Sequence, residues 1–198
     1  MTRAEIIETQ KRIGATPDGF WGPKSTARAK AHLKAMMPAK RFPSQAQVAT
    51  GRSVFGRHGE PDGSYEPPRR KIVLPFALNL YGDPKQPVPT LTPHEHCADA
   101  MLGAFQRLAE EFPTQAEREA AGILCYDGLY NPRSMRGGTS WSMHSWAIAI
   151  DLDAGRNGNS THWPTRAKMP IRVMECFARE GFTCAGAFWS RDAMHAQA

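Results

Sequence analysis

The chain has 198 residues, enough for one well-packed domain and a small additional module. Hydrophobic residues make up 41% of it, a proportion typical of globular proteins, and no apolar run is long enough to span a bilayer. The formal net charge of +6 arises at one end: residues 1–50 hold nine Lys or Arg against three Asp or Glu, whereas residues 51–198 are balanced. The basic end indicates a polyanionic partner (nucleic acid, anionic lipid or cell-wall polymer) or a well-solvated helix surface.

Two short helices are expected at the N-terminal end. Residues 4–13 have helical spacing, and Gly14 is suited to end that helix. After a Pro-Gly turn, a second helix is expected to reach about Met36, with Ser25 or Thr26 as its N-cap.

The rest of the chain predicts an α+β domain with helices outside a small, mainly antiparallel sheet. Residues 38–50 lack periodicity, which indicates a linker. Pro75 is expected to end the first strand, and Thr92 to cap the first helix of the domain. The expected strands are 71–74, 123–126 and 182–189, and the expected helices are 93–112, 115–121 and 170–180.

The most informative stretch is residues 147–153, which alternate with the period of a half-buried strand. Asp151 lies on a face with two alanines, which leaves room beside its carboxylate. His144 precedes Asp151 by seven residues, so a turn or bulge near 145–146 is needed to bring both side chains to the same side.

A second carboxylate–imidazole pair, Asp192 and His195, lies at the end of the chain, where one helical turn would bring the two together. Two histidines and an aspartate around an open fourth position are typical of a catalytic zinc site, with Asp192 left to move protons. In the alternative interpretation Asp151 caps a turn, the histidines lie on the surface and Asp192 pairs with Arg191.

The pattern Ser142-x-His144-x-x-Ala147-x-Ala149-x-Asp151, followed by Asp192-x-x-His195, resembles the VanY-type zinc peptidases. That family comprises D-alanyl-D-alanine carboxypeptidases and L-alanyl-D-glutamate endopeptidases of bacterial cell-wall peptides. The chain departs from the family pattern at Ala147, where Gly is usual, and at Asp192, where many members have Glu. The resemblance runs from about Val54 to the C-terminus and is closest to the form found in phage endolysins.

The resemblance implies roles for individual residues. His144, Asp151 and His195 would hold zinc, and Asp192 would be the general base. Other side chains are expected to bind substrate, although surface ion pairs, turn hydrogen bonds and core packing explain them equally simply. These side chains belong to Arg133, Arg136, Ser142 and Trp189. Arg133 matches the family arginine and would steady the scissile carbonyl or a carboxylate of the substrate.

The N-terminal string from Gln10 to Thr26 is similar to the peptidoglycan-binding module of lysins, which usually contains L-G…D-G-x-x-G-P-x-T. By this resemblance the wall-binding residues are Asp18, Gly19, Trp21 and Gly22. In the alternative interpretation these residues only shape a helix–loop–helix. The segment is short for a module that folds by itself.

These expectations define a peptidoglycan-binding segment at 1–37, a linker at 38–50 and a zinc peptidase domain at 51–198. The resemblance implies a monomeric phage endolysin that hydrolyses a stem-peptide amide, L-Ala–D-Glu foremost. Without a signal peptide it would remain in the host cytoplasm until release onto the cell wall. The alternatives are a D-Ala-D-Ala carboxypeptidase and a non-catalytic wall-binding protein; a nucleic-acid binder and membrane insertion are disfavoured.

Overall fold

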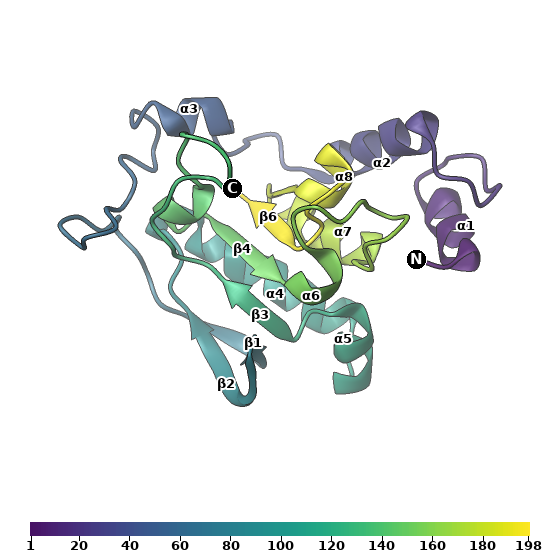
Figure 1. Ribbon diagram of the computed structural model, residues 1–198. Helices are drawn as coiled ribbons and strands as arrows, with labels where there is room; N and C mark the ends of the chain where they lie inside the picture. The colour runs from purple at the N-terminus through teal and green to yellow at the C-terminus, as the bar shows by residue number, and fades with distance from the viewer.

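A computed structural model describes residues 1–198. The predicted metal ligands lie on or next to a mixed sheet with the strand order β2-β1-β3-β4-β6-β5 (Figure 1). β1 and β3 run parallel, and all other neighbouring strands are antiparallel. The predicted α+β class, with a mainly antiparallel sheet, is therefore confirmed. The strands are β1 (Ile72–Leu80), β2 (Asp83–Leu91), β3 (Cys125–Gly128), β4 (Ala149–Leu152), β5 (Thr183–Cys184) and β6 (His195–Gln197).

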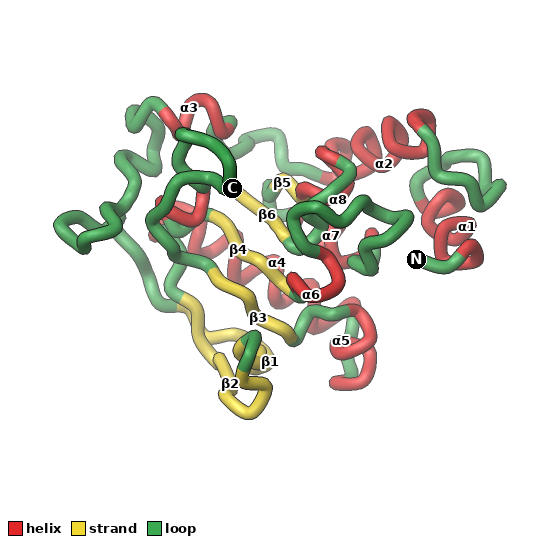
Figure 2. Tube along the Cα trace, viewed as in Figure 1, coloured by secondary structure: helices red, strands yellow, loops and turns green.

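Two helices, α4 (Ala98–Glu111) and α7 (Ile171–Arg179), lie behind the sheet in Figures 1 and 2. Their aromatic side chains form the centre of the core: the Phe105 ring lies 5.9 Å from that of Phe76 in β1 and 6.0 Å from that of Phe177 in α7. None of the helices combines the length and the apolar character that crossing a bilayer requires. The remaining helices are α1 (Arg3–Arg12), α2 (Pro23–Met36), α3 (Gln45–Ala49), α5 (Gln115–Ala121), α6 (Ala154–Asn157), α8 (Ala185–Trp189) and the 3₁₀ turns η1 (Glu95–Cys97) and η2 (Met143–Trp146).

The first strand is longer than predicted because Pro75 does not end it. β1 continues to Leu80, and its pairing with β2 shifts register between Val73 and Leu78. An irregularity of this kind accommodates a proline that has no N–H to donate. β2, for which no element was predicted, is a proline-containing edge strand, the position in a sheet that tolerates proline.

Other boundaries also differ from the prediction. Of the expected strand 182–189 only β5 is extended, and the chain then turns into α8. The expected linker 38–50 contains α3, which begins with a capping box at Ser44. Gly22, with Pro23 as the first helical residue, precedes α2 in place of the expected serine or threonine cap.

The expected helix 93–112 begins one turn late. The His94 side chain accepts from the His96 N–H and starts η1, so the predicted cap, Thr92, lies between the end of β2 at Leu91 and η1. α4 follows directly from Ala98. The helices predicted at 4–13, to Met36, at 115–121 and at 170–180 correspond to α1, α2, α5 and α7.

The N-terminal helices are joined to the sheet domain by a buried carboxylate. Glu175 of α7 has a side chain only 4% exposed; it accepts two hydrogen bonds from Arg12 of α1, at 2.7 and 2.6 Å, and lies 2.8 Å from His32 Nε2 of α2. The Trp21 ring meets Trp163 edge-on at 5.0 Å. These contacts seat α1 and α2 directly on the domain. The functional division at 38–50 stays a prediction.

Replacing Glu175 with Gln is expected to lower the free energy of unfolding by about 2 kcal/mol at neutral pH, because charge-assisted hydrogen bonds to Arg12 are lost. Burial alone would raise the Glu175 pKa, but Arg12 and His32 outweigh it and hold the pKa below the usual 4.5. The carboxylate therefore stabilises the fold above about pH 4.5, and this contribution disappears as the pH falls through the folded-state pKa.

Urea unfolding measured from neutral to acid pH checks this expectation: the difference between the two proteins should shrink as the pH falls. Glu8→Gln is the matched control, because Glu8 pairs with Lys11 on the surface, where the two side chains are 71% and 56% exposed. Such a pair contributes about 0–1 kcal/mol. Equal losses in the two variants would contradict the role assigned to Glu175.

Candidate metal centre

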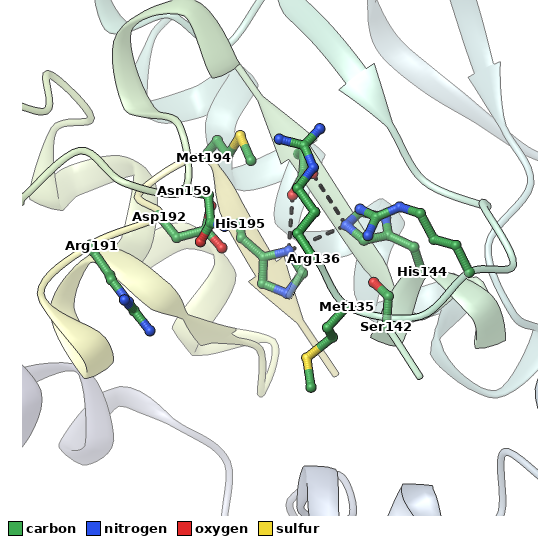
Figure 3. Close-up of a pocket in the computed structure, with 11 residues that line it drawn as sticks. Met135, Arg136, Ser142, His144, Asn159, Arg191, Asp192, Met194 and His195 are labelled. Atoms are coloured by element: carbon green, nitrogen blue, oxygen red, sulfur yellow. Dashed lines mark hydrogen bonds and ion pairs between the residues drawn. The ribbon is translucent and has the colours of Figure 1, made fainter. Parts of the chain in front are cut away.

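Three elements bring His144, Asp151 and His195 together. β4 and β6 pair antiparallel with Asp151 directly opposite His195, so the two side chains project from the same face. His144 lies in η2, which ends at Ala147 in a left-handed conformation (φ 57°). This is the turn that was expected near residues 145–146, which brings the His144 side chain to the same side of the chain as Asp151. One ligand atom from each of the three side chains lies within 4.8 Å of the others (Figure 3).

The strand that carries Asp151 is buried more completely than its alternation predicts. All four residues of β4 are buried, so the expected half-buried strand is wrong in this respect. Asp151 itself is only 8% exposed, and α4 and α7 lie behind the sheet (Figure 1). The carboxylate therefore lies in a partly dry environment, where charge interactions are strong.

Hydrogen bonds outside the cluster orient both imidazole rings. His144 Nδ1 lies 2.8 Å from the carbonyl oxygen of Leu129, and His195 Nε2 lies 3.0 Å from Oε1 of Gln197. A carbonyl oxygen only accepts, so these two ring nitrogens carry hydrogens, as assigned from their partners. His144 Nε2 and His195 Nδ1 are left facing Asp151.

The inward-facing atoms crowd around one point. His144 Nε2 is 3.2 Å from Asp151 Oδ2, His195 Nδ1 is 2.9 Å from Asp151 Oδ1, and the two nitrogens are 3.3 Å apart. Burial would raise the Asp151 pKa, but the neighbouring His144 and His195 rings hold it well below its usual range. Burial would lower the His195 pKa, and the neighbouring Asp151 raises it instead. The cluster thus favours a cation between its members.

A divalent metal fits this donor set. Two neutral imidazole nitrogens and one carboxylate oxygen are the ligands that zinc accepts in sites with an open fourth position. The outer ring nitrogens already have hydrogen-bond acceptors, as metal-binding histidines almost always do. His144 Nε2, His195 Nδ1 and an oxygen of Asp151 would hold the ion.

Asp192 lines the same hollow but is not one of the three clustered residues. Its Oδ1 is buried without a hydrogen-bond partner, and burial raises its pKa. The expected helical turn between Asp192 and His195 is wrong. Asp192 has φ 58°, and a β-turn closed by the bond from His195 N to Asp192 O links the two (3.0 Å).

Arg133 and Arg136 also line this hollow, which has a volume of about 290 Å³. The guanidinium of Arg133 donates to the carbonyl of Ser134 at 3.3 Å. Ser142 lines the hollow as well, but Ser145 holds the arginine loop: its hydroxyl accepts from Arg133 N at 3.0 Å and donates to Arg133 O at 3.1 Å. Of the residues predicted for metal binding, catalysis and substrate binding, the structure thus brings all except Trp189 together around this hollow.

Trp189 is 42% exposed and does not line the hollow. Its ring lies 6.0 Å from that of His195, tilted by 30°. Its predicted contact with substrate stays a prediction.

The predicted wall-binding residues form the loop between α1 and α2, at a separate hollow of about 1040 Å³ that Asp18, Trp21 and Gly22 line. Gln10 organises the loop, because its amide donates to Asp18 Oδ1 at 2.9 Å and accepts from Gly19 N at 2.8 Å. Trp21 donates to Thr26 Oγ1 at 3.1 Å. Each of these contacts also suits the purely structural interpretation, and wall binding stays a prediction.

Sequence reasoning missed Gln197, Ser145 and the carbonyl of Leu129. Gln197 had one available signal, because residues two apart on a strand share a face and His195-x-Gln197 places an amide beside the ring. The Leu129 carbonyl had none, since any residue type supplies one.

Replacing Gln197 with Leu is expected to weaken zinc binding about 10- to 100-fold, because His195 Nε2–H loses its acceptor and the ring is no longer held in the required tautomer. Competition with a chromogenic chelator measures the affinity, and ¹⁵N NMR of His195 reports the tautomer. Gln197→Glu, which keeps an acceptor, is the matched control and should bind zinc at least as well as the wild type. Unchanged affinity in the Leu variant would contradict this role.

A family model described as D-alanyl-D-alanine carboxypeptidase matches residues 136–198. The matched segment contains His144, Asp151, Asp192 and His195, and it begins after Arg133. No curated protein and no solved structure matches the chain significantly. Over residues 136–198 the chain is therefore similar to the D-alanyl-D-alanine carboxypeptidase family, which supports, at a coarse level, a zinc peptidase that acts on peptidoglycan.

Proposed function

We propose that this protein is a zinc-dependent peptidoglycan endopeptidase of the endolysin type, which hydrolyses a stem-peptide amide, L-Ala–D-Glu foremost. The observation that carries the proposal is the convergence of His144, Asp151 and His195 within 4.8 Å, with the unpaired carboxylate of Asp192 in the same hollow. The family match over residues 136–198 supports the same chemistry.

When bound, zinc would supply Lewis acidity: it lowers the pKa of a coordinated water from about 15.7 to about 7 and polarises a carbonyl. Asp192 accepts the proton of the attacking water and passes it to the leaving amine. Because burial raises the pKa of Asp192, its affinity for a proton suits both halves of this transfer. Arg133, held by Ser145, steadies the scissile carbonyl or a carboxylate of the substrate.

The α1–α2 segment would add affinity for the insoluble wall. Its loop carries Asp18, Gly19, Trp21 and Gly22, and all of these except Gly19 line a hollow separate from the metal centre. Because α1 and α2 are seated on α7 through Glu175, a wall polymer bound there would be presented to the active site at a constant distance. Such an arrangement raises the local substrate concentration without a flexible tether.

Mass spectrometry of purified peptidoglycan digested with and without a chelator tests the proposed activity. The expected result is new peptide termini that appear only when zinc is present and identify the bond. Release of free D-alanine would instead favour a carboxypeptidase, the second candidate, which the description of the matched family supports. Digestion that survives metal removal, or no digestion at all, would refute the proposal.

Asp192→Asn is expected to lower kcat about 10²- to 10⁴-fold while leaving zinc affinity almost unchanged, because the variant loses the proton acceptor but no metal ligand. Steady-state kinetics on the identified peptide and chelator competition measure the two effects. Asp151→Asn is the comparison variant and should lose zinc affinity as well. If Asp192→Asn retains full kcat, Asp192 is not the base.

A further inference from the structure

The hollow around the metal centre contains one side-chain amide that the proposed mechanism does not use. Asn159 lines the hollow, is exposed and makes no hydrogen bond within the protein through its side chain. Every other polar residue of the lining is an arginine, a histidine, an aspartate or Ser142. A neutral carboxamide can donate to a peptide carbonyl or accept from a peptide N–H, so Asn159 is suited to bind the backbone of a peptide substrate.

The segment that carries Asn159 runs along the segment that carries the proposed base. The backbone oxygen of Asn157 accepts from Met194 N at 3.2 Å, and that of Ser190 accepts from Trp163 N at 3.0 Å. An antiparallel β-bridge lies between these two bonds. Because the two segments run in opposite directions, the residues that follow Asn157 lie opposite Asp192.

The turn around Asn159 is anchored in the protein interior. Asn157 is fully buried; its side chain donates to Asp153 O at 3.1 Å and accepts from two backbone N–H groups of the segment before α7, at 2.8 and 2.7 Å. A hydrogen bond from Thr161 N to Gly158 O (2.8 Å) closes a β-turn that has Asn159 as its second residue. The backbone that presents the Asn159 side chain to the hollow is therefore well held.

This position relates Asn159 to one half of the substrate. Asp192 passes a proton to the leaving amine, so the nitrogen of the scissile bond must come within hydrogen-bonding distance of the Asp192 carboxylate. Figure 3 shows Asn159 in the same part of the hollow as Asp192. An extended peptide advances roughly 3.3–3.6 Å per residue, so the next amide of the leaving peptide lies about one residue length beyond Asp192.

We propose that Asn159 forms a hydrogen bond with the next peptide amide on the amine side of the scissile bond and thereby determines specificity for endopeptidase substrates. This inference rests on the proposed function and narrows its substrate class: the leaving group must be a peptide rather than a single amino acid. A stem peptide cut at L-Ala–D-Glu meets this requirement, because its amine product continues beyond the glutamate. The amino acid released by a carboxypeptidase has no such amide.

Two versions of the peptide identified in the peptidoglycan digest test the proposal: the natural one, and one in which the next amide on the amine side is an ester. The ester lacks the N–H and has a weaker carbonyl acceptor. For the wild type, the ester should raise KM about 10-fold with little change in kcat, as expected for the loss of one hydrogen bond. Asn159→Ala should raise KM for the natural peptide by a similar factor and should not distinguish the two peptides.

Ser160→Ala is the matched control, because Ser160 is the exposed neighbour of Asn159 in the same turn and does not line the hollow. It should behave as the wild type with both peptides. Zinc affinity and thermal unfolding are measured for both variants and should not change, since the Asn159 side chain makes no hydrogen bond within the protein.

The assignment is overturned if the ester raises KM equally in the wild type and in Asn159→Ala, or if Asn159→Ala cleaves the natural peptide as well as the wild type does. Release of a single amino acid as the only amine product overturns it as well. Failure of the wild type to cleave any peptide refutes the proposed function instead. Calorimetric binding of the two peptides to the wild type and to Asn159→Ala then tests Asn159 alone.

Discussion

The candidate site depends on one buried carboxylate between two imidazole rings. Asp151 lies 2.9 Å from His195 Nδ1 and 3.2 Å from His144 Nε2, and its pKa is held far below the usual range although burial opposes ionisation. An unpaired charge at this depth would be strongly destabilising, so the two imidazole rings contribute to the stability of the fold as well as to the site. Leu129 and Gln197 then decide which nitrogen of each ring faces inward.

Backbone strain is concentrated around this carboxylate. The four non-glycine residues with positive φ are Ala147, Asp153, Ser190 and Asp192. One lies between His144 and Asp151, one follows Asp151 by two residues, and two precede His195. Left-handed conformations are costly outside glycine and persist where the surrounding structure enforces them. The same backbone conformation explains why the VanY-type pattern usually has glycine at the position of Ala147, because Ala147 is itself left-handed. Alanine in place of glycine adds some backbone strain but removes no metal ligand.

The N-terminal helices are connected to the candidate site by packing contacts. α2 lies against α7 and α8, and α8 leads into the strained turn that carries Arg191 and Asp192 (Figure 1). Trp21 meets Trp163, whose own backbone N–H holds Ser190. A continuous series of contacts therefore links the predicted wall-binding loop to the turn beside the metal centre. This arrangement differs from two modules joined by a flexible chain, since the intervening segment contains α3 and packs Phe42 against Phe182.

The sequence by itself determined the helices with strong periodicity and caps, the α+β class, and the residue types of the site, since these depend on spacing over a few neighbouring residues. It also required a turn between His144 and Asp151, which η2 and Ala147 supply. Only the tertiary structure decided that Asp151 stands opposite His195, 44 residues away, and that Gln197 orients His195. It alone brought Arg133, Arg136 and Arg191 to the hollow that contains the cluster. Contacts between distant segments are selected by strand order and by the packing of the whole core, which no local pattern specifies.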